Sequence, residues 1–291
     1  MDETKSIEEL MALYELEPSV TDIYVEGDTD KYFVEWFLFR HHWSHVNVYS
    51  IDIVEVPDEV LRRHNLPIHS NRSKVIALSL ELFSRFDTNI KVMCIADRDF
   101  EDALPSVSPP PILHFTDGNS LETYSFNQLG LSKLVSVVLG GFPISPAEMQ
   151  RCLAEVLRQV YAIRMANVKL KWNMEDIPFT RYVEIAGTRI QFNAEAFTRA
   201  YIQKNDRWKN RSQFERVFKE CLLSLTPDDA RNARGHDLCE LILHLVRRLR
   251  RDRKFGNRET LEGVLLGAVE TADLEAHPLF QGIRTLGMAN N

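Results

Sequence analysis

Short apolar runs, rich in β-branched residues, recur through the first half of the chain at 21–26, 90–97 and 112–116, and residues 46–54 show strand residues that alternate with polar ones. Continuous apolar runs of this kind are typical of strands that are buried on both faces of a parallel sheet. Between them, residues 30–42 and 72–86 carry apolar side chains at helical spacing, and Ser6 and Glu9 form a capping box that predicts a helix over 6–17. The pattern predicts an α/β fold, a parallel sheet flanked by helices in the order β-α-β-α-β-β.

The second half of the chain has a mainly helical pattern. Ser145-Pro146 followed by Glu148 is a helix start signal, and the helix is predicted to reach about residue 166. Residues 181–192 alternate around Ala186-Gly187, which predicts a β-hairpin. Further helices are predicted at 194–204, 211–224, 236–252 and 258–271. Because Gly140-Gly141 separates the two patterns, we predict an α/β domain over 1–140 and a helical accessory region with a hairpin over 141–291.

Carboxylates follow two of the predicted strands at the point where each strand ends. Glu26 and Asp30 come directly after the first strand, and Asp97 and Asp99 come after the third. The carboxyl ends of parallel strands meet at one edge of the sheet, where open α/β sheets bind their ligands. We therefore expect one acidic pocket that needs a cation, and its oxygen ligands favour Mg²⁺ or Mn²⁺ over zinc.

Each acidic motif has a simpler interpretation when it is taken alone. Gly-Asp and Asp-Arg-Asp after a strand are also ordinary turn and helix N-cap sequences. The two motifs together, in this order and with a helix between them, favour a functional site.

Composition limits the classes of function. The 291 residues carry a net charge of −7, so any contact with nucleic acid must come from a local basic patch. The four cysteines lie far apart without CxxC spacing, which predicts reduced thiols rather than zinc ligands or disulfides. The first residues lack the features of a signal peptide, and no apolar run has the length of a membrane span. We expect a cytoplasmic protein without membrane contact.

A basic cluster ends the helix predicted at 236–252. It contains Arg247, Arg248, Arg250, Arg251, Arg253 and Lys254. One or two cations would complement the helix dipole, so this number favours binding to nucleic acid or to an acidic partner. At the start of the same helix, Gly235-His236-Asp237 is either a helix cap or a catalytic acid or base, and the sequence leaves both open.

These motifs together resemble a known family. Glu26-Gly27 after the first strand and Asp97-x-Asp99 after the third resemble the Toprim signature of topoisomerases, primases and the overcoming-lysogenization-defect nucleases, over about residues 20–130. Four longer motifs restrict the resemblance to one group within the Toprim proteins. They are Val-Glu-Gly-Asp-Thr-Asp-x-x-Phe (25–33), Asp-Arg-Asp-Phe (97–100), Thr-Asp-Gly-x-x-Leu-Glu (116–122) and Gly-His-Asp-Leu (235–238). This set is similar to the bacterial Toprim-like effectors that include the toxic subunit of the PARIS anti-phage systems.

The resemblance implies roles for individual residues. Glu26 would be the general acid/base, and Asp97 and Asp99 would be metal ligands. Glu122, with Asp30 and Asp117, would extend the metal site. PARIS effectors are restrained by an ATPase partner that senses a phage protein, and are then released to cleave host transfer RNA. Because no strong candidate for a nucleophilic tyrosine domain is visible, hydrolysis is favoured over strand passage.

The sequence thus supports three hypotheses about function. We favour a metal-dependent endoribonuclease that cleaves tRNA in anti-phage defence, with His236 as a further catalytic candidate. The alternatives are a Toprim DNA endonuclease and a non-catalytic Toprim module, and the sequence does not separate RNA from DNA. The aromatic residues of 30–42 also suggest that the active form is a homodimer and the restrained form a monomer bound to the ATPase.

Overall fold

The chain folds into two compact units. A computed structural model describes residues 4–105, 107–250, 255 and 257–288. The first unit comprises Met1–Asp117 together with Glu270–Asn291, and the second is Gly118–Val269. The division thus falls after Asp117 rather than near the predicted boundary at residue 140. Residues 270–291, which we predicted to be accessory, belong to the first unit.

A four-stranded parallel sheet forms the centre of the first unit. Its strands are β2 (Thr21–Val25), β3 (Val46–Ser50), β5 (Lys91–Ala96) and β6 (Leu113–Phe115). They lie in the order β3-β2-β5-β6, and every neighbouring pair is parallel. The chain moves from β2 to β3 on one side and then returns to β5 on the other side of β2. This reversal is a topological switch point, and it lies between β2 and β5.

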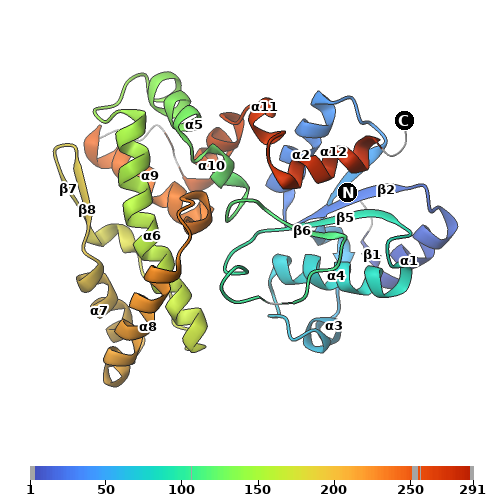
Figure 1. Ribbon diagram of the computed structural model, residues 1–291, viewed down its shortest axis with the longest axis horizontal. Helices are drawn as coiled ribbons and strands as arrows, with labels where there is room; N and C mark the ends of the chain where they lie inside the picture. Colours follow the sequence, from blue (N-terminus) through green and yellow to red (C-terminus); the bar gives the residue numbers. More distant parts are fainter. Residues whose placement is uncertain (1–3, 106, 251–254, 256, 289–291) are drawn as a thin grey trace. The chain divides into compact units, whose positions relative to one another are not determined.

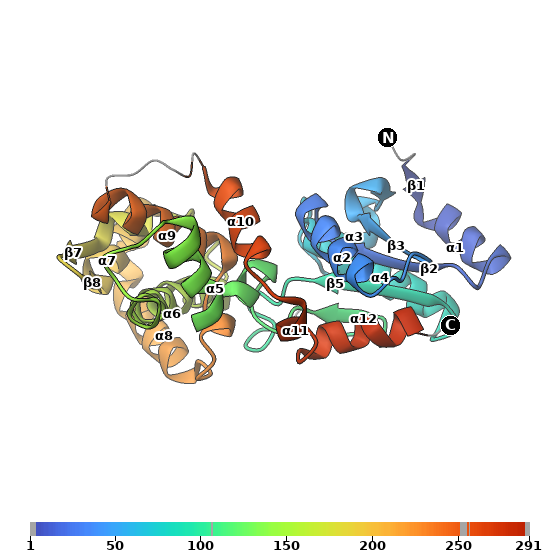
Figure 2. The same ribbon diagram turned by 90° about the horizontal axis from the view of Figure 1, so that it is seen from above.

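Helices cover both faces of this sheet (Figure 1), as the sequence pattern predicted. One face carries α1 (Ile7–Leu16), α3 (Asp58–Arg63) and α4 (Asn71–Phe86). The other face carries α2 (Asp28–Arg40) and α12 (Pro278–Met288), which lie beside one another in Figure 2. The predicted capping box is confirmed, because Ser6 Oγ accepts the Glu9 N–H at 3.2 Å and Glu9 accepts the Ser6 N–H at 2.7 Å. A short parallel pair, β1 (Lys5–Ser6) with β4 (Val54–Glu55), adds to this unit.

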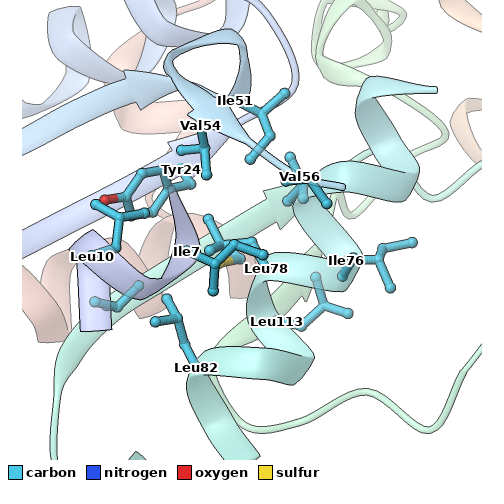
Figure 3. Close-up of a cluster of buried hydrophobic side chains, with 14 of the residues drawn as sticks. Ile7, Leu10, Tyr24, Ile51, Val54, Val56, Ile76, Leu78, Leu82 and Leu113 are labelled. Atoms are coloured by element: carbon cyan, nitrogen blue, oxygen red, sulfur yellow. The ribbon is translucent and has the colours of Figure 1, made fainter. Parts of the chain in front are cut away.

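The core between the sheet and the helices α1, α3 and α4 is apolar (Figure 3). Leu10 from α1 and Leu78 and Leu82 from α4 pack against Tyr24 of β2 and Leu113 of β6. All five side chains are buried, and burial of apolar side chains such as these is the main favourable contribution to folding.

The C-terminal helix closes the opposite face. Phe280 of α12 lies with its ring centre 4.8 Å from that of Phe37 on α2. Asp117, at the end of β6, accepts the Leu279 N–H at 3.3 and 3.4 Å with its two oxygens and so caps the start of α12. The sequence patterns did not predict α12 or α11 (Thr271–Leu274). Asp117, suggested as an extension of the metal site, has a structural partner here.

The second unit is mainly helical. Its long helix α6 (Pro146–Leu170) starts at the predicted Ser145 cap, whose Oγ accepts the Glu148 N–H at 3.3 Å. The other helices are α5 (Gln128–Lys133), α7 (Ala194–Lys204), α8 (Arg211–Ser224), α9 (Gly235–Leu249) and α10 (Arg258–Gly267). An antiparallel pair joins β7 (Val183–Ala186) to β8 (Arg189–Phe192). No helix in the described part of the chain has the length and apolar character that a membrane span requires.

The packing of α12 gives a stability prediction. A methyl group on Gly287 would lie 2.5 Å from a ring carbon of Trp43, whereas one on Gly263 of α10 would meet nothing within 4 Å. Alanine is the better helix former at both positions. We expect Gly287→Ala to lower the free energy of unfolding by about 1–3 kcal/mol through overpacking, and Gly263→Ala to leave it unchanged or raise it. Urea unfolding measures both, and equal stability of the two variants would contradict the packing of α12 against Trp43.

Candidate active site

Glu26 and Asp97 lie together at the switch point of the sheet. They follow β2 and β5, which pair in register with Tyr24 opposite Cys94. A Glu26 carboxylate oxygen accepts the backbone N–H of Asp97 at 2.7 Å. The two motifs that the sequence singled out are therefore joined by a hydrogen bond at the carboxyl edge of neighbouring parallel strands, where this kind of sheet binds ligands.

Two more carboxylates act on Glu26. Asp30 is the third residue of α2, and its side chain accepts the Gly27 N–H at 3.1 Å in a capping arrangement. Asp99 lies in the loop after β5 with φ of 45°, in the left-handed region that non-glycine residues seldom adopt. The negative charges of Asp30 and Asp99 both disfavour ionisation of Glu26.

The pKa of Glu26 is raised to about 8. Burial of the carboxyl group is the largest cause, and the repulsion by Asp30 and Asp99 adds to it. The hydrogen bond from Asp97 and the charge of Arg72 oppose the rise. Glu26 is thus able to carry a proton near neutral pH, which is a property of acid/base groups in active sites.

The guanidinium of Arg72 lies among these acids. From the first turn of α4 its Nε donates to the Asp97 carbonyl at 2.7 Å, and its Nη2 pairs with Glu101 at 2.6 Å. Its Nε also lies 3.6 Å from a carboxylate oxygen of Asp99. Next to it, Asn71 donates to the Glu26 carbonyl at 2.9 Å. The N-terminus of α4 therefore holds both acidic loops in place.

Sequence reasoning missed Asn71 and Arg72 as parts of the site. A signal for them was available, because a crossover helix runs antiparallel to the strands that it connects. The start of the helix before β5 must therefore lie at the same sheet edge as the ends of β2 and β5. Polar residues in its first turn are consequently candidates for the site.

The donor set fits a hard cation. Asp30, Asp97 and Asp99 offer carboxylate oxygens, which Mg²⁺ and Mn²⁺ prefer. Within the described residues, no three His, Cys, Asp or Glu side chains are already gathered into a metal-binding group. Mg²⁺ usually binds one or two protein carboxylates and completes its shell with water and substrate phosphate.

Glu122 and His236 belong to the second unit. The Glu122 carboxylate packs against the start of α9, where only a glycine at 235 leaves it room. His236 is exposed, with Nδ1 3.2 Å from Glu262, and Asp237 is buried in an ion pair with Arg164 at 2.8 Å. The predicted contribution of Glu122 to the metal site, and the catalytic role of His236, stay predictions.

The basic cluster at the end of α9 divides into different environments. Arg247 and Arg248 are exposed on the last turn of the helix. Arg250 instead donates to the backbone carbonyls of Leu139 and Gly141, so it fixes a loop. Arg251, also predicted to bind nucleic acid, lies outside the described residues.

Comparison with known proteins adds no assignment. No protein-family model matches the chain, and no curated protein matches it. What the protein does must therefore be inferred from its own side chains.

The raised pKa of Glu26 predicts a pH-dependent stability. The folded-state pKa of Glu26 is about 8, against an ordinary value of 4.5 in the unfolded chain. Between these values the unfolded chain binds fewer protons than the folded one, so stability falls as pH rises across this window. In buffer with chelator, the melting temperature of the wild type should fall relative to that of Glu26→Gln from pH 5 to 8.5. The control Glu59→Gln removes an exposed carboxylate and should follow the wild-type curve. A constant difference between wild type and Glu26→Gln would contradict the raised pKa.

Arg72 gives a second prediction. Its side chain and that of Glu101 are only 16% and 8% exposed, whereas the Arg62–Asp58 pair on α3 is 62% and 52% exposed. Removing one partner of a largely buried pair leaves an uncompensated charge. We expect Arg72→Gln to lower the free energy of unfolding by about 2–4 kcal/mol, and Arg62→Gln to change it by less than about 1 kcal/mol. Urea unfolding of the metal-free variants tests this, and similar small losses for both would show that Arg72 does not hold the site together.

Proposed function

We propose that the first unit is a Toprim-like catalytic unit that hydrolyses phosphodiester bonds of nucleic acid with the help of Mg²⁺ or Mn²⁺. The observation that carries this proposal is the hydrogen-bonded pair of Glu26 and Asp97 at the switch point of the parallel sheet. A binding module alone would not need Glu26, Asp97 and Asp99 together at this edge. Their coincidence therefore favours hydrolysis over simple ligand binding.

Each residue of the site has a role in this chemistry. Asp97 and Asp99 would hold the cation, with Asp30 beside them. When it is bound, the cation lowers the pKa of a coordinated water and stabilises the charge on the attacking and leaving oxygens. Glu26 would move the proton. Arg72 keeps the loop from Asp97 to Glu101 attached to α4, so the carboxylates stay close to one another despite their repulsion.

The substrate and partners follow from the sequence resemblance. We propose host tRNA as the substrate and an anti-phage effector role, with restraint by an ATPase sensor until a phage trigger arrives. Arg247 and Arg248, both exposed, are candidate contacts to the phosphate backbone. On α2, Tyr32 and Phe39 are 62% and 75% exposed, and this face is the proposed homodimer contact of the active form.

The test is hydrolysis by matched variants. Purified wild type, Glu26→Ala, Asp97→Ala and the control Glu59→Ala are incubated with a tRNA pool and with plasmid DNA, with Mg²⁺ or with EDTA. Cleavage by the wild type and by Glu59→Ala should require the cation. Both site variants should lose at least about a thousandfold in rate while they keep their circular dichroism spectrum.

Three results would decide against parts of the proposal. If a folded Glu26→Ala protein still cleaves nucleic acid, Glu26 is not the catalytic acid or base. Cleavage of plasmid but not of tRNA would replace the endoribonuclease with a DNA endonuclease. Absence of cleavage of both nucleic acids would favour the binding module.

A further inference from the structure

The second unit carries an exposed basic and aromatic surface that the sequence motifs did not point to. It is formed by the turn after α6 and by the connection between α7 and α8. We call it the tryptophan–arginine surface, and its members are Lys171, Trp172, Arg207, Trp208, Lys209 and Arg211.

The two loops are fixed to each other. The side chain of Asn205, which follows α7, accepts the Glu175 N–H at 2.7 Å and donates to the Glu175 carbonyl at 3.0 Å. Arg207 lies over the ring of Trp172, with its Cζ 5.6 Å from the ring centre. The ring centre of Trp172 in turn lies 5.7 Å from that of Phe214 on α8, and the Phe214 side chain is buried. The surface is therefore held in shape before any ligand binds.

Trp208 is the exposed aromatic side chain of this surface. Half of it is accessible to solvent, and the Cζ of Arg211 lies 5.3 Å from its ring centre. Arg211 is itself held by Glu215 at 2.5 Å. An indole ring that is steadied by a cation and open to solvent offers a flat platform on which a nucleobase can stack.

Next to Trp208 in the sequence, Arg207, Lys209 and Arg211 stand against one carboxylate, Asp206, although the chain as a whole is acidic. On the neighbouring loop, Glu175 pairs with Lys204 and Asp176 pairs with Arg164. Lys171, Arg207 and Lys209 are exposed, and none of them has a carboxylate within ion-pair distance in the part of the chain that the structure describes. One or two cations would be enough to complement the dipole at a helix C-terminus. Arg207 and Lys209, which flank Trp208 in the sequence, and Lys171 on the neighbouring loop suit a ligand that combines phosphates with planar bases.

We propose that the tryptophan–arginine surface binds an unpaired segment of nucleic acid, with a base stacked on Trp208 and phosphates contacting Lys171, Arg207 and Lys209. The identification of this segment as part of an RNA substrate rests on the proposed function. The binding itself requires no metal, so it is separable from hydrolysis. Unpaired bases are required because only an unstacked base exposes its ring face to Trp208.

The experiment measures binding in EDTA, where no hydrolysis takes place. Fluorescence anisotropy follows a labelled 12-nucleotide single-stranded RNA, the same sequence as DNA, and its RNA duplex. We expect the wild type to prefer the single strands, Trp208→Ala to weaken single-strand binding about tenfold, and Trp208→Phe to retain most of it. Lys171→Glu with Lys209→Glu should weaken binding and reduce its dependence on salt. RNA bound more tightly than DNA would support the RNA substrate.

The matched control is Arg151→Glu. Arg151 is an exposed cation on the first turns of α6, twenty residues before Lys171 and so about 30 Å away along the helix. The Arg151→Glu protein should have an RNA affinity within about twofold of that of the wild type, because charges at this distance are largely screened by salt. Wild-type affinity in the Trp208→Ala and double lysine variants would overturn the inference. So would competition by poly-glutamate as effective as that by RNA, because it would indicate a protein partner.

The cleavage assay separates this inference from the proposed function. If a Trp208→Ala protein cleaves tRNA at the wild-type rate and affinity, the proposed hydrolase activity is retained and the tryptophan–arginine surface is excluded as a binding site. Single-strand binding that depends on Trp208 in a protein that cleaves nothing would support the surface and exclude the hydrolase.

Discussion

The acidic edge of the first unit depends on one cation that the chain supplies itself. Glu26, Asp30 and Asp99 lie at one sheet edge, where the charges of the two aspartates act on Glu26 and repulsion would drive the loops apart. The guanidinium of Arg72 offsets this by bonding the Asp97 carbonyl and Glu101 and by lying close to Asp99. The geometry of a guanidinium matters here, since its planar donors reach several acceptors at once, as a lysine ammonium would not. The loops can therefore be ordered before any ligand is bound.

The parts of the structure that follow from local pattern were predictable. Apolar runs gave the parallel strands, and cap residues such as Ser6 and Ser145 gave helix starts. The proximity of Glu26 and Asp97 followed from these elements, because the ends of parallel strands share an edge. Strand endings alone were enough to locate the candidate site.

The parts that depend on distant segments were not predictable in this way. The assignment of 270–291 to the first unit rests on ring contacts of Phe280 with Phe37 and on the cap that Asp117 provides, and neither leaves a periodic signal in the sequence. Asp117 illustrates the ambiguity, because an aspartate after a strand suits a cation and a helix N-terminus equally well. Likewise, the sequence suggested that Arg250 contacts phosphate, whereas the structure shows that it donates hydrogen bonds to the carbonyls of Leu139 and Gly141.

The connectivity of the first unit has a consequence for biosynthesis. The whole second unit is inserted between β6 and α11, so the sheet leaves the ribosome long before α12, one of the two helices that cover the same face. Until α12 has been translated, Phe37 lacks its contact with Phe280, Met93 lacks its neighbour Gly282, and Asp117 has no Leu279 N–H to accept. The unit that carries the carboxylates can therefore reach its final packing only after the second unit has been synthesised.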